Sequence, residues 1–239
     1  NTDAGFTGDM ILNGGDATAS DTLVVNVDQN TVEVDIDPNV VADGTIDGAL
    51  GLNLVQYNGL EALTVNAQTT TVGTPLEIRG FTGYTFNPDT ASDAGEVLTD
   101  EVPVAFVGIG SGETLALDGD GTLTVNGRGT DDDFTVAADG DVTIAGRATI
   151  DRTGLTDLVL NGLDGDDTFV VPGENPYASV TLSGGGPSGS DVATLNADGT
   201  SGTPITIDLE NEVVTGGGFG TGTGEGVLLS GVEHVDLDA

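Results

Sequence analysis

Residues 154–161 read GLTDLVLN, and this phrase recurs with small changes along the whole chain. It consists of a glycine, an apolar residue and Thr or Glu, followed by an alternating apolar segment that ends in Asn or Asp. Such alternation is typical of a strand with one buried face. Repetition of one supersecondary unit predicts a stacked architecture. The other copies lie at residues 5–13, 59–66, 80–87, 108–118 and 231–238.

The spacing of the copies predicts the size of the stacked unit. Their starting positions fit multiples of a step of about 25 residues, the size of one β-solenoid coil. Alternating segments at residues 31–36, 177–182 and 204–209 fill the longer gaps. We therefore expect an all-β fold, a parallel β-solenoid (β-helix) of about 25 residues per coil. Hairpin connections between the same strands would instead make a β-sandwich, single or in tandem, and the sequence leaves open whether the strands pair in parallel.

The composition agrees with a repetitive β-structure. Among 239 residues there are 39 glycines, only 4% aromatic residues and no Trp, so the core is expected to consist of Val, Leu, Ile and Ala. We expect residues 1–239 to form a single elongated repeat domain, with possible blocks at 1–67, 68–125 and 126–239. Because the last residues lie inside a copy of the phrase, we also expect the chain to be part of a longer array.

The charge excludes two classes of partner. Forty acidic residues face four Lys or Arg and one His, which gives a formal net charge of −36. This excess repels nucleic acid and anionic lipid, and no apolar run has membrane-spanning length. It also opposes compaction unless salt or divalent cations offset it. The chain has no Cys, so disulfides are excluded, and the acidic, cysteine-free composition favours a large secreted protein.

Acidic, glycine-rich turns follow several of the strand phrases. The clearest is GLDGDDTFV at residues 162–170, which fits the repeat G-G-x-G-x-D-x-U-x except for Leu163. Looser versions lie at residues 14–23, 127–134 and 185–192. Glycines let the backbone turn its carbonyl groups inward, and Asp carboxylates complete an oxygen cage of the kind that Ca²⁺ prefers. The alternative is that these are ordinary turn residues with solvated carboxylates.

The turns resemble the calcium-binding repeats of RTX (haemolysin-type) exoproteins, and their alternation with strands resembles the repeat arrays of large bacterial surface proteins. The resemblance implies Ca²⁺-dependent folding outside the cell, at the cell surface or secreted. Only residues 162–170 match well, and the turns recur at longer intervals than the nine residues of that family. Carried over, the resemblance implies these Ca²⁺ ligands: Asp164, Asp166 and Asp167, then Asp191, Asp132, Asp133, Asp16 and Asp21.

The remaining polar residues do not form a recognisable catalytic set. The D-G-D pairs at residues 118–120 and 139–141 are typical of hairpin turns. The single histidine, His234, is expected on the outer face of a strand. We therefore expect a non-enzymatic extracellular structural module, such as a surface layer, sheath, adhesin stalk or filament subunit, that joins neighbouring or identical modules end to end. A carbohydrate-binding or polysaccharide-cleaving β-helix protein is the alternative, so polysaccharide stays open as a partner.

Overall fold

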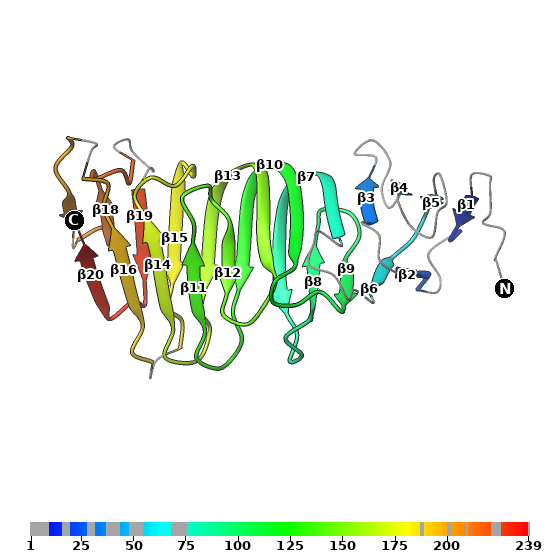
Figure 1. Cartoon of the computed structure of the whole chain (residues 1–239), viewed down its shortest axis with the longest axis horizontal. Helices are drawn as coiled ribbons and strands as arrows, with labels where there is room; N and C mark the ends of the chain where they lie inside the picture. The colour runs from blue at the N-terminus through cyan, green and yellow to red at the C-terminus, as the bar shows by residue number, and fades with distance from the viewer. Residues whose placement is uncertain are drawn as a thin grey trace. The chain divides into compact units, whose positions relative to one another are not determined.

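The computed structural model describes residues 10–15, 20–27, 32–36, 44–47, 55–67, 76–186, 189–199, 202–208, 210–220 and 226–238. Every regular element in these ranges is a β-strand, which confirms the all-β prediction. No helix that could cross a membrane occurs within them. The chain divides into two units, Asn1–Asp120 with Arg147–Thr153, and Gly121–Gly146 with Gly154–Ala239. Figure 1 labels most of the strands, which are numbered in chain order.

Within the described residues, the first unit combines parallel strand pairs with antiparallel ones. β1 pairs with β5, β2 with β6, β3 with β7 and β6 with β9 in parallel. β4 lies antiparallel between β3 and β5, and β8 lies antiparallel between β7 and β9. The strands are β1 (Met10–Asn13), β2 (Thr22–Val27), β3 (Val32–Ile36), β4 (Gly44–Asp47), β5 (Val55–Asn58), β6 (Ala62–Ala67), β7 (Leu76–Pro88), β8 (Ala94–Leu98) and β9 (Val104–Val107). β10 (Thr114–Asn126) and β13 (Thr149–Asn161) contribute residues to both units.

The core of the first unit is made by the inward positions of these alternating strands. On β6, Leu63 and Val65 are almost completely buried, while the residues between them are partly exposed. Val104 of β9 lies opposite Leu63, and Phe106 lies opposite Val65. Because the registers match, each buried side chain packs on an equivalent side chain of the next strand, as the period-2 pattern predicts.

The second unit contains two columns of parallel strands. One column runs β11–β14–β16–β20, and the other runs β13–β15–β19. Phe134 and Phe169 stack within the first column, with ring centroids 5.1 Å apart. Antiparallel hairpins join β11 to β12 and β17 to β18. The strands are β11 (Asp133–Val136), β12 (Val142–Ile144), β14 (Thr168–Pro172), β15 (Ser179–Ser183), β16 (Val192–Asn196), β17 (Thr206–Asp208), β18 (Val213–Thr215), β19 (Gly226–Ser230) and β20 (His234–Asp238).

The uniform step of about 25 residues holds for only part of the chain. Asp157 and Ser179, which are hydrogen-bonded neighbours, are 22 residues apart, and Asp167 and Asp191 are 24 apart. Other neighbours in the stacks are separated by 35, 40 and 42 residues. Each longer separation includes an antiparallel hairpin between the two parallel strands. The sequence therefore predicts the stacking, and the inserted hairpins make the step irregular.

One of the two D-G-D predictions is wrong. Asp118 and Asp120 lie inside the continuous strand β10 rather than in a turn. The intervening Gly119 is required because a Cβ atom there would lie 2.2 Å from the carbonyl oxygen of Phe81. The second pair is confirmed as a turn, between β11 and β12, where the Asp141 amide donates to Asp139 Oδ1. The same Asp-Gly-Asp sequence thus marks close backbone approach in one place and a turn in the other.

Candidate functional site: stacked acidic turns

The acidic turns of the second unit begin at equivalent glycines that lie one above another. The amide of Gly127 donates to the carbonyl oxygen of Asn161 at 2.7 Å. The amide of Gly162 donates to Ser183 at 2.8 Å, and that of Gly184 donates to Ser230 at 2.9 Å. Parallel pairing thus continues to the last residue of each strand. The turns that follow start in register.

Four carboxylates, Asp132, Asp167, Asp191 and Glu233, form what we call the inner acid row. The amide of Asp132 donates to Asp167 Oδ1, and the amide of Asp167 donates to Asp191 Oδ1, both at 2.8 Å. The amide of Asp191 donates to Glu233 Oε2 at 2.9 Å. Asp167 and Asp191 are 0% exposed, so each carboxylate satisfies a backbone donor that water cannot reach.

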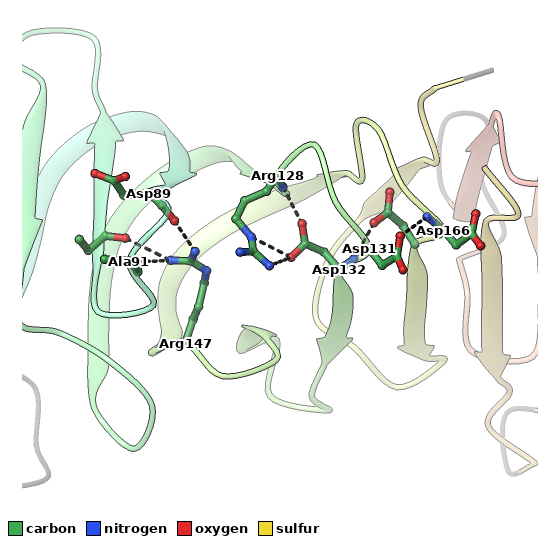
Figure 2. A network of polar contacts seen from close by, with 9 residues as sticks. Asp89, Ala91, Arg128, Asp131, Asp132, Arg147 and Asp166 are labelled. Atoms are coloured by element: carbon green, nitrogen blue, oxygen red, sulfur yellow. Dashed lines mark hydrogen bonds and ion pairs between the residues drawn. The ribbon is translucent and has the colours of Figure 1, made fainter. Parts of the chain in front are cut away.

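Arg128 caps the inner acid row at Asp132. Its amide donates to Asp132 Oδ2 at 2.6 Å, and its Nε and Nη2 donate to Asp132 Oδ1 at 3.2 and 3.0 Å (Figure 2). The pairing of a buried carboxylate with a guanidinium offsets much of the cost of removing the carboxylate from water. At this end of the row, the negative charge is therefore compensated locally.

Further along the row the charge is not compensated in this way. Asp167 Oδ2 and Asp191 Oδ2 are buried without a hydrogen-bond partner in the described residues. The pKa of Asp167 is raised to about 6: burial is the largest cause, the hydrogen bond from the amide of Asp132 acts in the opposite direction, and the nearby carboxylates add to the rise. Burial also raises the pKa of Asp191, and its bond from the Asp167 amide opposes that shift. Both shifts favour the neutral carboxyl group in the folded state.

Two glycines create the space that these carboxylates occupy. A Cβ atom on Gly162 would lie 2.1 Å from Asp167 Oδ2 and 2.7 Å from the carbonyl oxygen of Gly184. A Cβ atom on Gly184 would lie 2.3 Å from Asp191 Oδ2 and 2.1 Å from the carbonyl oxygen of Gly231. Neither glycine has a positive φ, so close packing alone excludes a side chain at both positions. The carboxylate and the glycine of one turn are therefore a matched pair.

A second set of carboxylates, Asp131 and Asp166, forms an outer acid row whose hydrogen bonds run the other way. Asp131 Oδ1 accepts from the amide of Asp166 at 2.9 Å (Figure 2), and Asp166 Oδ1 accepts from the amide of Ser190 at 3.0 Å. Next to them, Asp133 Oδ1 accepts from Thr168 Oγ1 at 2.5 Å. Asp131 and Asp166 are exposed. Each turn is thus joined to its neighbours by inner and outer carboxylates.

The first unit contains the same kind of pair. The amide of Asp21 donates to Glu61 Oε2 at 2.6 Å, and the amide of Glu61 donates back to the carbonyl oxygen of Asp21 at 3.0 Å. Asp191 and Glu233 make the same reciprocal contacts, at 2.9 and 3.1 Å. In both cases the Glu is the third residue of the repeated phrase. A Glu at this position therefore marks the carboxylate that holds the preceding turn.

The structure brings together most of the residues expected to bind Ca²⁺, in hydrogen-bonded rows. Asp132, Asp167 and Asp191 share the inner row, and Asp133 and Asp166 lie beside it. Asp164 Oδ1 lies 2.6 Å from where a Cβ atom on Gly186 would be, which places it against the next turn. Asp21 belongs to the first unit, and Asp16 lies outside the described residues.

Sequence reasoning did not single out Asp131 of the outer acid row, Glu233 of the inner acid row, or Glu61, which holds Asp21 in the first unit. The repeated Gly-apolar-Glu phrase was the available signal for the two glutamates. Within the described ranges, no group of three or more His, Cys, Asp or Glu side chains is placed to hold a metal ion. Ca²⁺ binding therefore stays a prediction. His234 is exposed, as expected, and its ring nitrogen lies 2.8 Å from Asp236 Oδ1.

Arg147, in the first unit, has a structural role. It is almost fully buried, and its guanidinium donates to the carbonyl oxygens of Asp89, Ala91 and Ala94 (Figure 2). These carbonyl groups belong to the loop that joins β7 to β8 and to the start of β8. The side chain therefore fixes the shape of that connection.

Comparison with known proteins gave no matching protein family, curated protein or solved structure.

Proposed function

We propose that this chain is a non-enzymatic structural module of an extracellular or cell-surface assembly, such as a surface layer, sheath, adhesin stalk or filament. In this proposal its parallel strands are the coils of a β-solenoid, and modules join end to end. The inner acid row is the observation that supports it most. A catalytic carboxylate must be open to substrate, whereas Asp167 and Asp191 are fully buried and bind the backbone of adjacent turns.

The hydrogen bonds of the row fit a role in resisting mechanical force. Each of its hydrogen bonds joins residues 24 to 42 positions apart in sequence, so separating adjacent turns breaks bonds between charged and backbone groups. Each bond occupies a buried backbone donor that would otherwise lack a partner, whether its carboxyl group is charged or neutral. Together with parallel backbone pairing, they would resist sliding of one coil past another.

The outer carboxylates and the large negative charge support a role for Ca²⁺. Asp164 and Asp166 are exposed beside the fully buried Asp167, in the turn that fits the calcium-binding repeat best. A divalent cation at such turns would offset the repulsion that a net charge of −36 creates. Ca²⁺ would then link assembly to an environment with free calcium, which is typical outside cells.

The test compares thermal unfolding in millimolar Ca²⁺ and in excess EGTA, at matched ionic strength. A ligand that binds only the folded state at one hundred times its Kd adds about 2.7 kcal/mol to the free energy of unfolding. We expect a higher melting temperature and longer particles by electron microscopy in Ca²⁺. Asp164→Asn with Asp166→Asn should remove the calcium effect. Asp151→Asn with Glu174→Gln, an equal change of charge at exposed positions elsewhere, should retain it.

Two results would contradict the proposal. Equal melting temperatures in Ca²⁺ and EGTA would remove the calcium site. A compact monomer under every condition of salt and calcium would remove the end-to-end assembly. Matched ionic strength matters here because screening alone also stabilises an acidic protein.

A further inference from the structure

Four strands end at an asparagine that is followed by glycine. The strands are β1, β5, β10 and β13, and the dipeptides are Asn13-Gly14, Asn58-Gly59, Asn126-Gly127 and Asn161-Gly162. These are all the Asn-Gly sequences in the chain. Asparagine is a thermolabile residue, and a following glycine, which has no side chain, lets its backbone nitrogen approach the asparagine Cγ. Each of these strand ends is therefore a candidate site for loss of the side-chain amide.

This reaction needs only water. The glycine amide loses its proton, its nitrogen bonds to the asparagine Cγ, and the Cγ–Nδ2 bond breaks, so that ammonia leaves and a five-membered succinimide remains. Water then breaks one of the two bonds between the ring nitrogen and a carbonyl carbon. Cleavage at Cγ gives aspartate. Cleavage at the backbone carbonyl carbon gives isoaspartate, in which the chain continues through the side chain and the former backbone carbonyl is a free carboxylate.

The parallel stack holds the attacking nitrogens in hydrogen bonds. The amide of Gly127 donates to the carbonyl oxygen of Asn161 at 2.7 Å, at the paired ends of β10 and β13 (Figure 1). The amide of Gly162 donates to the carbonyl oxygen of Ser183 at 2.8 Å. Asn161 Nδ2 also donates to Asn126 Oδ1 at 2.7 Å. Ring closure at either junction has to break these bonds, so it requires local opening of the stack.

The two junctions of the second unit are protected by different partners. The acceptor for Gly127 is the backbone carbonyl of Asn161, which is itself an Asn-Gly residue. The acceptor for Gly162 is Ser183, which has no side-chain amide to lose. Conversion of Asn161 to isoaspartate removes the acceptor of Gly127 from the backbone. Either product also replaces Asn161 Nδ2, the donor to Asn126, by an oxygen. Conversion of Asn126 leaves the bond between Gly162 and Ser183 in place.

We propose that Asn161 and Asn126 are an ordered pair of modification sites, in which conversion of Asn161 to aspartate or isoaspartate opens the Asn126-Gly127 junction to the same reaction. The conversion is irreversible and adds negative charge to a chain that already carries −36. A turn that has opened and reacted does not regain its register, because isoaspartate lengthens the backbone by one carbon. This modification does not require the proposed assembly.

The time course of conversion in the natural chain is the first test. Peptide mass spectrometry follows each asparagine at mildly alkaline pH, in high salt for the folded chain and in concentrated urea for the unfolded one. We expect conversion of Asn161 to be at least about tenfold slower in the folded chain, because opening of a packed turn is a rare event. In the folded chain Asn126 should follow Asn161 after a lag, and in urea the two should start together. Asn66 and Asn196, each followed by alanine, should stay intact.

Reciprocal serine substitutions test the order. Serine ends the equivalent strands at positions 183 and 230, so the stack accommodates it. In the folded Asn161→Ser chain, conversion of Asn126 should slow at least about threefold, because the carbonyl that holds Gly127 then stays in the backbone. In the folded Asn126→Ser chain, conversion of Asn161 should not slow. In urea neither substitution should change the rate at the other site.

Asn26→Ser is the matched control. It removes the equivalent side-chain pair of the first unit, in which Asn66 Nδ2 donates to Asn26 Oδ1 at 2.8 Å, and neither of these residues precedes a glycine. It should leave both rates in the second unit unchanged. Circular dichroism establishes that each variant is folded, and if one is not, the lag in the natural chain decides.

Two results would overturn the proposal. The first is conversion of Asn161 at the same rate in the folded and the unfolded chain. The second is conversion of Asn126 in the folded chain without a lag, or at the natural rate in Asn161→Ser. Both results would leave the proposed structural function standing, since neither concerns assembly or Ca²⁺.

Discussion

Replacing Asp167 by Asn should remove a pH-dependent loss of stability. Burial raises the pKa of Asp167 from 3.8 to about 6. Because the folded state binds the proton more tightly than the unfolded state, this group destabilises the fold as pH rises from about 4 through 6. Two pKa units correspond to about 3 kcal/mol. Asn keeps an oxygen that can accept from the amide of Asp132 and carries no charge.

We therefore expect the free energy of unfolding of Asp167→Asn at pH 7.5 to exceed that of the natural chain by up to about 3 kcal/mol, so that the variant unfolds at a higher urea concentration. At pH 4 the difference should be less than about 1 kcal/mol, because Asp167 is protonated in the folded state and only about half ionised in the unfolded state, so most of the destabilisation develops above that pH. The measurement is urea unfolding from pH 4 to 7.5, in EGTA and 1 M NaCl. High salt suppresses the general repulsion among the other carboxylates, which would otherwise give a slope of the same sign.

Asp151→Asn is the matched control, because Asp151 is an exposed carboxylate of the first unit that takes no part in the acid rows. It should leave the pH slope of the natural chain unchanged. The reasoning is refuted if Asp167→Asn is less stable than the natural chain at pH 7.5 and retains its full pH slope. That result would mean that the ionised carboxylate is the form that the fold requires.

Two further substitutions test packing around the rows and in the first unit. Gly162→Ala should lower the free energy of unfolding by at least about 2 kcal/mol, because the new Cβ atom would lie 2.1 Å from Asp167 Oδ2. Gly199→Ala should leave it unchanged, because the space around Gly199 is open. Chemical unfolding compares the two variants, and equal effects would contradict the steric argument. Arg147→Met should cost about 3 kcal/mol because it leaves three backbone carbonyl groups without their charged donor. Arg79→Met is the control: it breaks a surface ion pair with Glu77 at 3.9 Å and should lower the free energy of unfolding by less than about 1 kcal/mol. Similar melting temperatures for the two Arg variants would count against the proposed role of Arg147.

The repeated phrase was sufficient to predict stacked strands. Alternation along residues 62–67 and 158–161 identified buried faces correctly, because a period of two directly reflects which side of a strand is covered. It could not give strand direction, since parallel and antiparallel strands share that period. It also could not reveal hairpins: the alternation at residues 204–209 predicts a strand, but not that Thr206–Asp208 pairs in an antiparallel hairpin with Val213–Thr215.

The candidate site was predictable in location but not in chemistry. Acidic residues after the strand phrases did gather in rows, because in-register strands place the following turns at one level. Asp167 and Asp166 are adjacent in sequence, yet one is fully buried and the other exposed. That difference depends on contacts 24 to 35 residues away, which no local pattern encodes.

The varying length of chain between members of the inner acid row has a practical consequence. Successive members are separated by 35, 24 and 42 residues, yet each makes an equivalent bond to its neighbour. The additional residues are accommodated as hairpins that leave the row undisturbed. The tip between β11 and β12 is therefore a natural place to graft foreign peptides, and a scaffold that tolerates such loops could present them at regular intervals.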